Sequence, residues 1–282
     1  MMMMNLEALP EDCFARILSL TSPQDACRLS LVSSMVHSMA DLDSVWEVFL
    51  PTDYKAIMSR LVTPVVFSSN KDLFMRLCTP RLIDGGRKIF SIEKSARNKC
   101  YVVGARELSI TWATNPLYWI WTPLHGSRFA EVAELRTIWW LEICGTVNTQ
   151  ILSPKTVYVA YLIVKFAGRA YGLDTHPSEV SLQVGNVTSQ GQVYLSHQAK
   201  KHALENAHSL SRLKASSRSK AYQGERQAIC ERRDGWIEIE LGSFYNDGSD
   251  KEVKMCLKEV KGQHLKGGLI VEGIELRPKS VL

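Results

Sequence analysis

The residues most able to do chemistry in this sequence are tryptophans in one polar stretch, residues 108–121. Trp112 and Trp119 are seven positions apart, an odd step that places them on opposite faces of one straight strand. Asn115-Pro116 breaks the strand between them, so a turn can bring both indoles to one opening. An indole suits a sugar, because a pyranose ring offers C–H groups to the aromatic face while its hydroxyls bond to acids or amides. Burial of both rings in a core explains the same pattern, and residue types leave the two interpretations open.

Motifs for catalysis and metal binding are missing from the sequence. It contains no G-x-S-x-G, no H-E-x-x-H and no glycine-rich phosphate loop. The seven cysteines are scattered and include no C-x-x-C pair, so we expect neither a disulfide framework nor a zinc site, as in a reducing compartment. We therefore expect a protein that is not an enzyme and that uses no metal or cofactor.

Length and composition predict one or two ordinary globular domains, with 282 residues, 45% of them hydrophobic and 22% charged. The four opening methionines are followed by a charged helix, and no stretch has the apolar length of a membrane span. We expect a soluble protein in the cytoplasm, the nucleus or both.

The basic character belongs to one segment, residues 197–233. It holds nine Lys or Arg and three Asp or Glu, a surplus of six against +5 for the whole chain. We interpret it as a solvated loop inserted between strands. A nuclear import signal or a nucleic-acid contact is the alternative, disfavoured because no aromatic residues alternate with the charges.

The pattern changes from helical to alternating at about Arg87, in segments rich in Val, Ile, Thr, Tyr and Trp. In residues 236–241 the aliphatic side chains share one face, predicted to be core, and two glutamates share the other, predicted to face solvent. Residues 157–166 are apolar at both parities, which predicts a central strand covered on both sides. About eight such strands predict an antiparallel β-sandwich of the jelly-roll type over residues 87–279.

The N-terminal part is predicted to be helical, which makes the whole chain an α+β protein with several domains. A helix should begin near Pro10, a second after Ser22 as N-cap with Pro23 in its first turn, and a third with Asp43 as its cap. The apolar stripes of these helices are too large for so short a segment to bury, so we expect them to bind a partner.

Residues 51–86 are predicted to be a helical connector, because prolines and Gly85-Gly86 divide them into short pieces. Ser69 is placed to cap one of its helices.

The N-terminal residues resemble an F-box, in the order Leu9-Pro10-Glu11-Asp12, Ile17-Leu18, Pro23, Asp25, Ser30, Val32-Ser33 and Trp46. The resemblance implies a three-helix module over residues 5–50 that docks on the Skp-type adaptor of a cullin-RING ubiquitin ligase. It further implies an adaptor-binding surface formed by Leu9, Pro10, Ile17, Leu18, Pro23, Leu29, Val32 and Trp46. The alternative is an ordinary helical hairpin that buries these residues in its own domain.

Residues 87–279 resemble the phloem protein 2 lectins of plants, which include the jasmonate-induced tobacco agglutinin. The resemblance is carried by Leu108-Ser109-Ile110-Thr111-Trp112, Tyr118-Trp119, Glu131-Val132-Ala133-Glu134-Leu135, Trp140-Leu141-Glu142-Ile143, Asp234-Gly235-Trp236-Ile237-Glu238-Ile239 and residues 267–278. It implies a jelly-roll lectin for N-acetylglucosamine oligomers and the N-glycan core. The sugar-site residues that it implies are Trp112, Trp119, Glu252 and Glu259.

The two implied acids should not reach one monosaccharide together. Seven extended residues span roughly 23 Å, so an unbroken strand carries Glu252 and Glu259 at opposite ends. Between them we favour Glu252, in the polar turn that follows residues 245–250.

Together the two resemblances predict a substrate-receptor subunit of a Skp-cullin-F-box ubiquitin ligase that captures glycoproteins. Its partners would be the Skp-type adaptor and a glycoprotein or other protein target, with no membrane and no nucleic acid. Two alternatives stay open. One keeps the ligase role with a β domain that binds protein independently of sugar. The other is a free-standing carbohydrate-binding protein.

Overall fold

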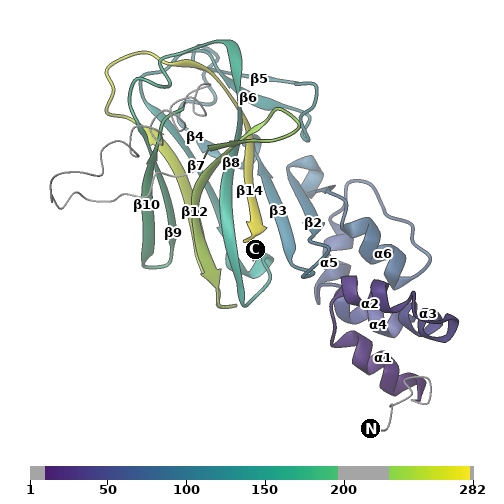
Figure 1. Cartoon of the computed structure of the whole chain (residues 1–282). Coiled ribbons are helices and arrows are strands. Elements are labelled where there is room, and N and C mark those ends of the chain that lie inside the picture. The colour runs from purple at the N-terminus through teal and green to yellow at the C-terminus, as the bar shows by residue number, and fades with distance from the viewer. Residues whose placement is uncertain (1–9, 196–228, 280–282) are drawn as a thin grey trace, which may run out of the picture. The chain divides into compact units, whose positions relative to one another are not determined.

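The protein is described by a computed structural model that places residues 10–195 and 229–279. These residues form two compact units, one ending at Val102 and the other running from Val103 to Lys279 (Figure 1). Leu9 and most of the basic segment 197–233 lie outside the described residues, so predictions for them stay predictions.

In its described part the first unit has six α-helices. Their starts follow the sequence signals: Pro10 precedes the first helix, and the Ser22 hydroxyl accepts the backbone N–H of Asp25 at 3.1 Å before the second. Ser69 caps the last helix in the same way, through the N–H of Asp72. These caps satisfy N–H groups that the first turn of a helix leaves without an intrahelical partner. The helices are α1 (Glu11–Ser19), α2 (Pro23–Leu29), α3 (Ser34–Ala40), α4 (Asp43–Phe49), α5 (Tyr54–Ser59) and α6 (Asn70–Leu77).

The prediction of three helices in the F-box-like segment is wrong, because the described part of this segment contains four. The missed helix, α3, begins after Ser33, whose hydroxyl accepts the N–H of Val36 at 3.3 Å. Its apolar stripe is only two turns long and is interrupted by serines, so the periodicity is weak in the sequence. Asp43 is the first residue of α4 and not its cap. Its carboxylate accepts the backbone N–H of Asn70 at 2.6 Å and so fixes the start of α6.

Trp46 is the centre of the core of this unit. Its ring is fully buried, lies 5.4 Å from the rings of Phe49 and Phe74, and donates its indole N–H to the Ala40 carbonyl at 2.6 Å. Phe74 belongs to α6, which the sequence places in the connector. The first helices therefore find part of the partner that their apolar faces require within their own chain.

A hairpin of β1 (Arg81–Ile83) and β2 (Lys88–Ile92) follows the helices. Both nitrogens of the Arg60 guanidinium fork donate to the Asp84 carboxylate at 2.8 Å, which lowers the pKa of Asp84 to about 2. This pair ties the end of α5 to the hairpin turn. The chain then passes through β3 (Lys99–Gly104) into the second unit.

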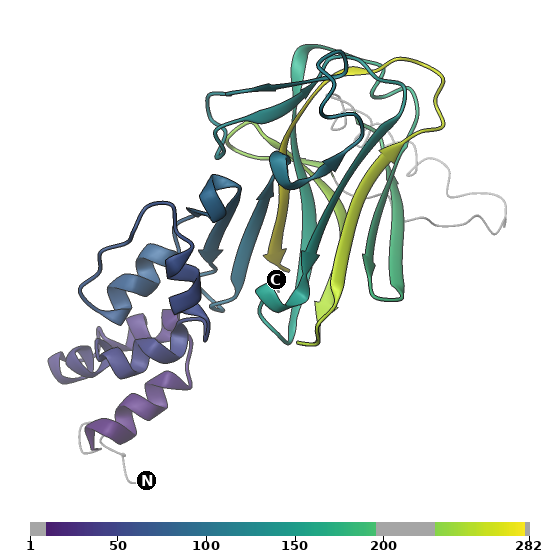
Figure 2. The ribbon, with the colours of Figure 1, turned by 180° about the vertical axis from the view of Figure 1, so that it is seen from behind.

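The second unit is a sandwich of two antiparallel sheets, as the sequence predicted (Figures 1 and 2). In the larger sheet the strand order β14-β8-β12-β11 is extended by β6, which pairs with β14, and by β5, which pairs with β6. The smaller sheet has the order β10-β9-β13-β7-β4. The bounds are β4 (Ser109–Ile110), β5 (Trp119–Thr122), β6 (Val132–Leu135), β7 (Leu141–Asn148), β8 (Thr156–Tyr171), β9 (Ser178–Val184), β10 (Val187–Val193), β11 (Ile229–Glu231), β12 (Ile237–Asn246), β13 (Glu252–Glu259) and β14 (Gly267–Pro278).

Strand β8 is the central strand that its apolar sequence predicted. It pairs with β12 on one side and β14 on the other, and its side chains are buried at both parities over most of its first half. On β12 the glutamates were predicted to face solvent, but Glu238 is buried. The guanidinium of Arg277 covers it and donates to both of its carboxylate oxygens at 2.6 Å.

Cys144 and Cys256 form a disulfide, contrary to the expectation that the cysteines stay unpaired. They lie directly opposite each other on β7 and β13, with Cα atoms 4.2 Å apart. They are 112 residues apart in sequence, so only the register of the two strands brings them together.

A buried carboxylate, that of Glu272, fixes a loop to β14. It accepts the backbone N–H of Arg128 at 2.7 Å and two guanidinium nitrogens of the same residue at 2.7 and 3.0 Å. The Arg128 guanidinium also donates to Glu275 at 2.8 Å. A charge at this depth is stable only when it is paired and hydrogen-bonded.

Replacing Arg128 with Ala leaves the charge of Glu272 without its cation, and we expect the free energy of unfolding to fall by about 3–5 kcal/mol. Lys261→Ala is the matched control, because Lys261 forms an exposed ion pair with Glu179 and should change the value by less than about 1 kcal/mol. Urea denaturation of the full chain measures both. Equal losses for the two variants would show that the buried pair contributes no more than a surface pair.

Candidate functional site

The predicted adaptor-binding residues divide by exposure. Among those that the structure describes, Pro10, Ile17 and Val32 are exposed, with 44% of Ile17 and 69% of Val32 accessible, and Leu29 is half-buried. These four can contact a partner.

Leu18, Pro23 and Trp46 are buried, so the prediction that they face the adaptor is wrong. Leu18 and Trp46 fill the core of the helical unit. Pro23 is buried at the first turn of α2, and it lines a cavity together with Phe74 and Met75 of α6. Their contribution to any docking surface is to hold its helices in place.

Further apolar side chains at the end of α1 and around the turn between α2 and α3 are exposed. Leu20 directly follows α1 and is 73% exposed, and Leu31, between α2 and α3, is 84% exposed. Met35 on α3 is also exposed. We call Ile17, Leu20, Leu31, Val32 and Met35 the apolar surface of the helical unit. The three-residue step from Ile17 to Leu20 was a signal for it in the sequence.

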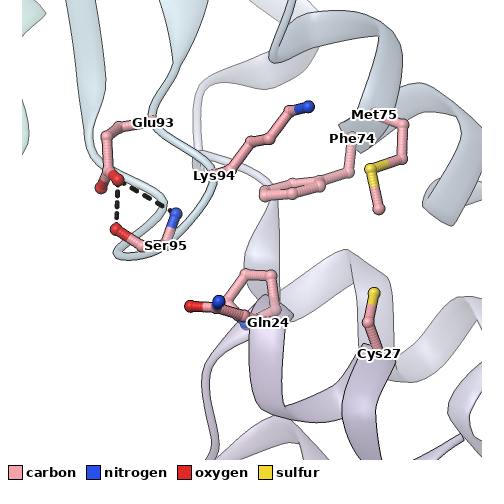
Figure 3. Close-up of a pocket in the computed structure, with 8 residues that line it drawn as sticks. Gln24, Cys27, Phe74, Met75, Glu93, Lys94 and Ser95 are labelled. Atoms are coloured by element: carbon pink, nitrogen blue, oxygen red, sulfur yellow. Dashed lines mark hydrogen bonds between the residues drawn. The ribbon is translucent and has the colours of Figure 1, made fainter. Parts of the chain in front are cut away.

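A cavity of about 300 Å³ lies within the helical unit beside Pro23, between α2, α6 and the turn after β2 (Figure 3). Its apolar wall is formed by Pro23, Cys27, Phe74 and Met75. The carboxylate of Glu93 at its rim accepts the N–H and hydroxyl of Ser95, so it stabilises its own turn. We assign this cavity no function.

An exposed aromatic cluster occupies the β unit at the tryptophan-rich stretch. The ring of Trp112 lies 5.1 Å from that of Tyr118 in a tilted arrangement and 5.4 Å from that of Trp139 in an edge-on arrangement. Trp112 and Trp139 are 41% and 47% exposed. We call these three residues the aromatic cluster. It offers flat apolar faces beside polar backbone, which is what the stacking of a pyranose requires.

The backbone of Trp112 adopts a left-handed conformation, with φ of 56°, which is rare and costly for a bulky residue. Two indoles hold it there. The N–H of Trp119 donates to the carbonyl of Thr111 at 3.1 Å, and that of Trp121 donates to the carbonyl of Ala113 at 3.0 Å. The residues on both sides of Trp112 thus each accept one indole hydrogen bond.

Trp119 itself is 1% exposed, so the prediction that it stacks against a sugar is wrong. It begins β5, and its ring points into the core while its N–H reaches the Trp112 turn. Trp119 holds the turn that carries the cluster, and Trp112 is the ring that this turn exposes. The sequence could not separate the two roles, because it left open which tryptophan entered the core.

The two predicted acids lie far from each other, and their side chains also point to opposite faces of the sheet. They stand at the two ends of the unbroken strand β13, and because seven is an odd step they point to opposite faces of the sheet. Glu252, opposite Asn148, is exposed. Glu259, opposite Leu141, is 3% exposed.

Glu259 lies at the same end of the smaller sheet as the aromatic cluster, but its side chain does not face solvent. Its carboxylate forms a buried ion pair with Lys266 and accepts the N–H of Gly262 at 2.8 Å. The Lys266 ammonium donates to the carbonyl of Trp139 at 2.6 Å. The prediction of a sugar-binding acid is therefore wrong for Glu259. Through Lys266, this residue instead fixes the backbone carbonyl of Trp139 in the aromatic cluster.

Glu252 cannot join the cluster either. The Trp112 turn follows Thr111, whose N–H donates to the carbonyl of Glu142 at 3.1 Å, near the start of β7. Glu252 pairs with Asn148 at the other end of that strand, roughly 20 Å away for six extended residues. The preference for Glu252 is wrong for a site at Trp112.

One carboxylate whose backbone adjoins the Trp112 turn belongs to Glu142, which sequence reasoning did not select. It accepts the indole N–H of Trp140 at 3.2 Å and the ammonium of Lys258 at 2.7 Å. The hydrogen bond from Lys258 is the main reason that the pKa of Glu142 is lowered, so the group is ionised at neutral pH. The available signal was the alternation in Trp140-Leu141-Glu142, which places the tryptophan and the acid on one face.

In the described part of the chain, no group of three or more His, Cys, Asp or Glu side chains is placed to hold a metal ion. Within the same residues, none of the helices has the length and apolarity that crossing a bilayer requires.

Two protein families match the chain over separate ranges. The F-box domain matches residues 6–48, and phloem protein 2 matches residues 98–278. The first range corresponds to helices α1 to α4 and the second to the β-sandwich.

Whole-length relatives combine the same two domains. F-box protein PP2-B15 of Arabidopsis thaliana is 46% identical over 280 residues, which cover 97% of each chain. F-box protein VBF of the same plant is 43% identical over 281 residues, or 96% of this chain and 99% of that one. F-box protein PP2-B13 is 42% identical over 279 residues, or 96% and 98%.

Solved structures are only remotely similar. The CBM22-1 xylan-binding domain of Paenibacillus barcinonensis Xyn10C covers 64% of this chain and 90% of its own, with 11% identity and a TM-score of 0.29. The GH26-CBM35 β-(1,4)-mannanase of Podospora anserina covers 65% and 28%, with 9% identity and a TM-score of 0.32. Similarity at this level supports no argument about fold or ligand.

Trp119→Phe removes the indole N–H and part of a buried ring, so we expect the free energy of unfolding to fall by about 1–3 kcal/mol. Trp112→Phe changes an exposed ring of the same loop and should alter it by about 0.5 kcal/mol or less. Urea denaturation followed by circular dichroism compares the two. A larger loss for Trp112→Phe than for Trp119→Phe would reverse the assigned roles.

Proposed function

The chain belongs to the family of F-box proteins that carry a phloem protein 2 domain, and on that premise we propose that it is the substrate-receptor subunit of a Skp-cullin-F-box ubiquitin ligase. In this role the helical unit binds the Skp-type adaptor, and the β unit recognises a glycan on the target protein. The observation that carries the proposal is that each unit exposes one surface suited to its task, the apolar surface in the first and the aromatic cluster in the second.

The apolar surface supports adaptor binding through its chemistry. Leu31 and Val32 form the turn between α2 and α3, and Ile17 and Leu20 are three residues apart at the end of α1. Exposed aliphatic side chains that gather at one place support a contact with another protein. Each contributes about 1.5–3 kcal/mol when fully buried at an interface.

The chain's contribution to ubiquitin transfer is proximity. A receptor that holds a target beside a charged conjugating enzyme raises the effective concentration of the reacting lysine without supplying a catalytic group. The protein therefore acts as an adaptor of the ligase and not as its transferase.

The aromatic cluster supports glycan binding. The Trp112 and Trp139 rings meet nearly edge to face and both stay largely exposed, so each offers aromatic surface to a ligand. N-acetylglucosamine oligomers and the N-glycan core fit such a surface, since each sugar has an apolar face for stacking and hydroxyl or amide groups for hydrogen bonds.

A second candidate keeps the ligase role but gives the β unit a protein ligand that is recognised without sugar. It is favoured by Leu117, an aliphatic side chain 68% exposed next to Tyr118, which suits a peptide better than a saccharide. A third candidate, a free-standing carbohydrate-binding protein, requires that the apolar surface binds no adaptor.

Val32→Asp places a charge in the apolar surface, and we expect it to weaken co-purification with a Skp-type adaptor at least tenfold, which corresponds to about 1.4 kcal/mol. Val66→Asp is the matched control, because Val66 is 82% exposed in the same unit but outside the surface. Adaptor binding that survives Val32→Asp, or that is lost equally in both variants, would contradict the proposed docking surface. No binding by the unaltered chain would favour the third candidate.

Trp112→Ala removes the exposed ring of the aromatic cluster and should abolish the signal of the full chain on an array of N-acetylglucosamine oligomers and N-glycans. Tyr245→Ala, which removes an aromatic side chain 58% exposed on β12, should leave the signal unchanged. An unaltered protein that gives no more signal than Trp112→Ala would favour the candidate with a protein ligand.

A further inference from the structure

A second group of side chains, one exposed and two half-buried, lies next to the aromatic cluster on the outer face of the smaller sheet. It consists of Trp140, Glu142 and Lys258, joined by the two hydrogen bonds that the Glu142 carboxylate accepts. We propose that these three residues form a second sugar subsite, which takes the neighbouring residue of an oligosaccharide whose first residue stacks on Trp112. The inference rests on the proposed glycan recognition and names the residues that hold the second sugar of the oligomer.

The indole of Trp140 is held for stacking. Its N–H is bonded to Glu142, which fixes the orientation of the ring, yet 41% of the residue is accessible. A tryptophan that served only the core would be buried, as Trp119 and Trp236 are. A fixed ring loses little entropy when a ligand binds, so stacking on it is more favourable than on a mobile side chain.

The polar groups of the subsite have capacity left for a ligand. Each carboxylate oxygen of Glu142 accepts one hydrogen bond within the protein and can accept another. The Lys258 ammonium has three donors and gives one to Glu142. Sugar hydroxyls both donate and accept, so adjacent hydroxyls of one pyranose can bond to the two charged groups together.

The charge of the subsite favours a neutral ligand. The positive charge of Lys258 is balanced by Glu142 at 2.7 Å, so the pair attracts an anionic ligand such as a phosphate or an acidic peptide only weakly. Charge-assisted hydrogen bonds to neutral hydroxyls remain available on both partners.

The subsite adjoins the cluster through the backbone. Trp139 and Trp140 are consecutive, so their Cα atoms are about 3.8 Å apart. Thr111, which precedes Trp112, donates its N–H to the carbonyl of Glu142 at 3.1 Å. The backbone of the subsite therefore lies beside that of the cluster, whereas Glu252 lies at the far end of β13, opposite Asn148.

The experiment is isothermal titration of the full chain with N-acetylglucosamine and its dimer and trimer. We expect affinity to rise from the monosaccharide to the dimer. Glu142→Gln and Trp140→Ala should each weaken dimer and trimer binding by about tenfold while leaving monosaccharide affinity unchanged, since hydrogen bonds to charged groups and aromatic stacking contribute at this level. Glu252→Gln, an exposed acid on the same strand as Lys258, is the matched control and should leave all three affinities unaltered.

The possible outcomes distinguish failure of the second sugar subsite from failure of glycan recognition as a whole. Oligomer binding that is lost in Trp112→Ala but unaffected by both subsite variants overturns the subsite and leaves glycan recognition standing. Equal losses for the monosaccharide and the trimer also overturn it, because Glu142 and Trp140 would then support the cluster and contact no second sugar. An unaltered chain that binds none of the three saccharides overturns both proposals.

Discussion

Hydrogen bonds from indole N–H groups to main-chain carbonyls hold the turns on which both units depend. Trp46 bonds to Ala40 in the helical unit, and Trp236 bonds to Gly126 at 3.1 Å in the β unit. Trp119 and Trp121 hold the two sides of the turn that carries Trp112. In each case a large apolar ring is buried, or half-buried for Trp121, while its single donor satisfies a carbonyl that an irregular turn would leave unpaired. The strained backbone of Trp112 is possible because two such bonds enclose it.

The remaining tryptophans have the opposite character. Trp112, Trp139 and Trp140 keep much of their ring surface in solvent, and all three lie where β4 and β7 meet at one end of the smaller sheet. Below them, the buried pair of Glu259 and Lys266 bonds to the Trp139 carbonyl. The cost of burying these charges is offset only by close pairing, so this support is rigid. The backbone that carries the exposed rings is therefore fixed from the interior of the sandwich.

Features encoded locally were predictable from the sequence, and features set by long-range packing were not. The caps at Ser22 and Ser69 form as predicted, because a cap depends on residues within one turn. The sandwich follows from strand periodicity, and β8 is central as its apolar run indicated. The burial of Trp46 under α6, by contrast, requires knowledge of which later helix packs on it.

The candidate site shows the same limit. The stretch around Trp112 was identified from residue type, but the choice between surface and core for Trp119 needed the path of the chain after the turn. The family-implied acids could be tested only by the register of β7 with β13, which separates Glu252 from the cluster and draws attention to Glu142. The same register brings Cys144 to Cys256, a pairing that no sequence spacing indicated.

The proposed receptor must bind the Skp-type adaptor and its target protein at the same time, so the central claim is tested by a measurement that requires both surfaces. The most direct measurement is the retention of a protein carrying N-glycans on an immobilised Skp-type adaptor, with and without this chain. We predict that the glycoprotein is retained only when the chain is present and that enzymatic removal of its glycans releases it. Retention that is unchanged after deglycosylation, or that does not require the chain, would contradict the claim that this protein links a ubiquitin ligase to glycosylated targets.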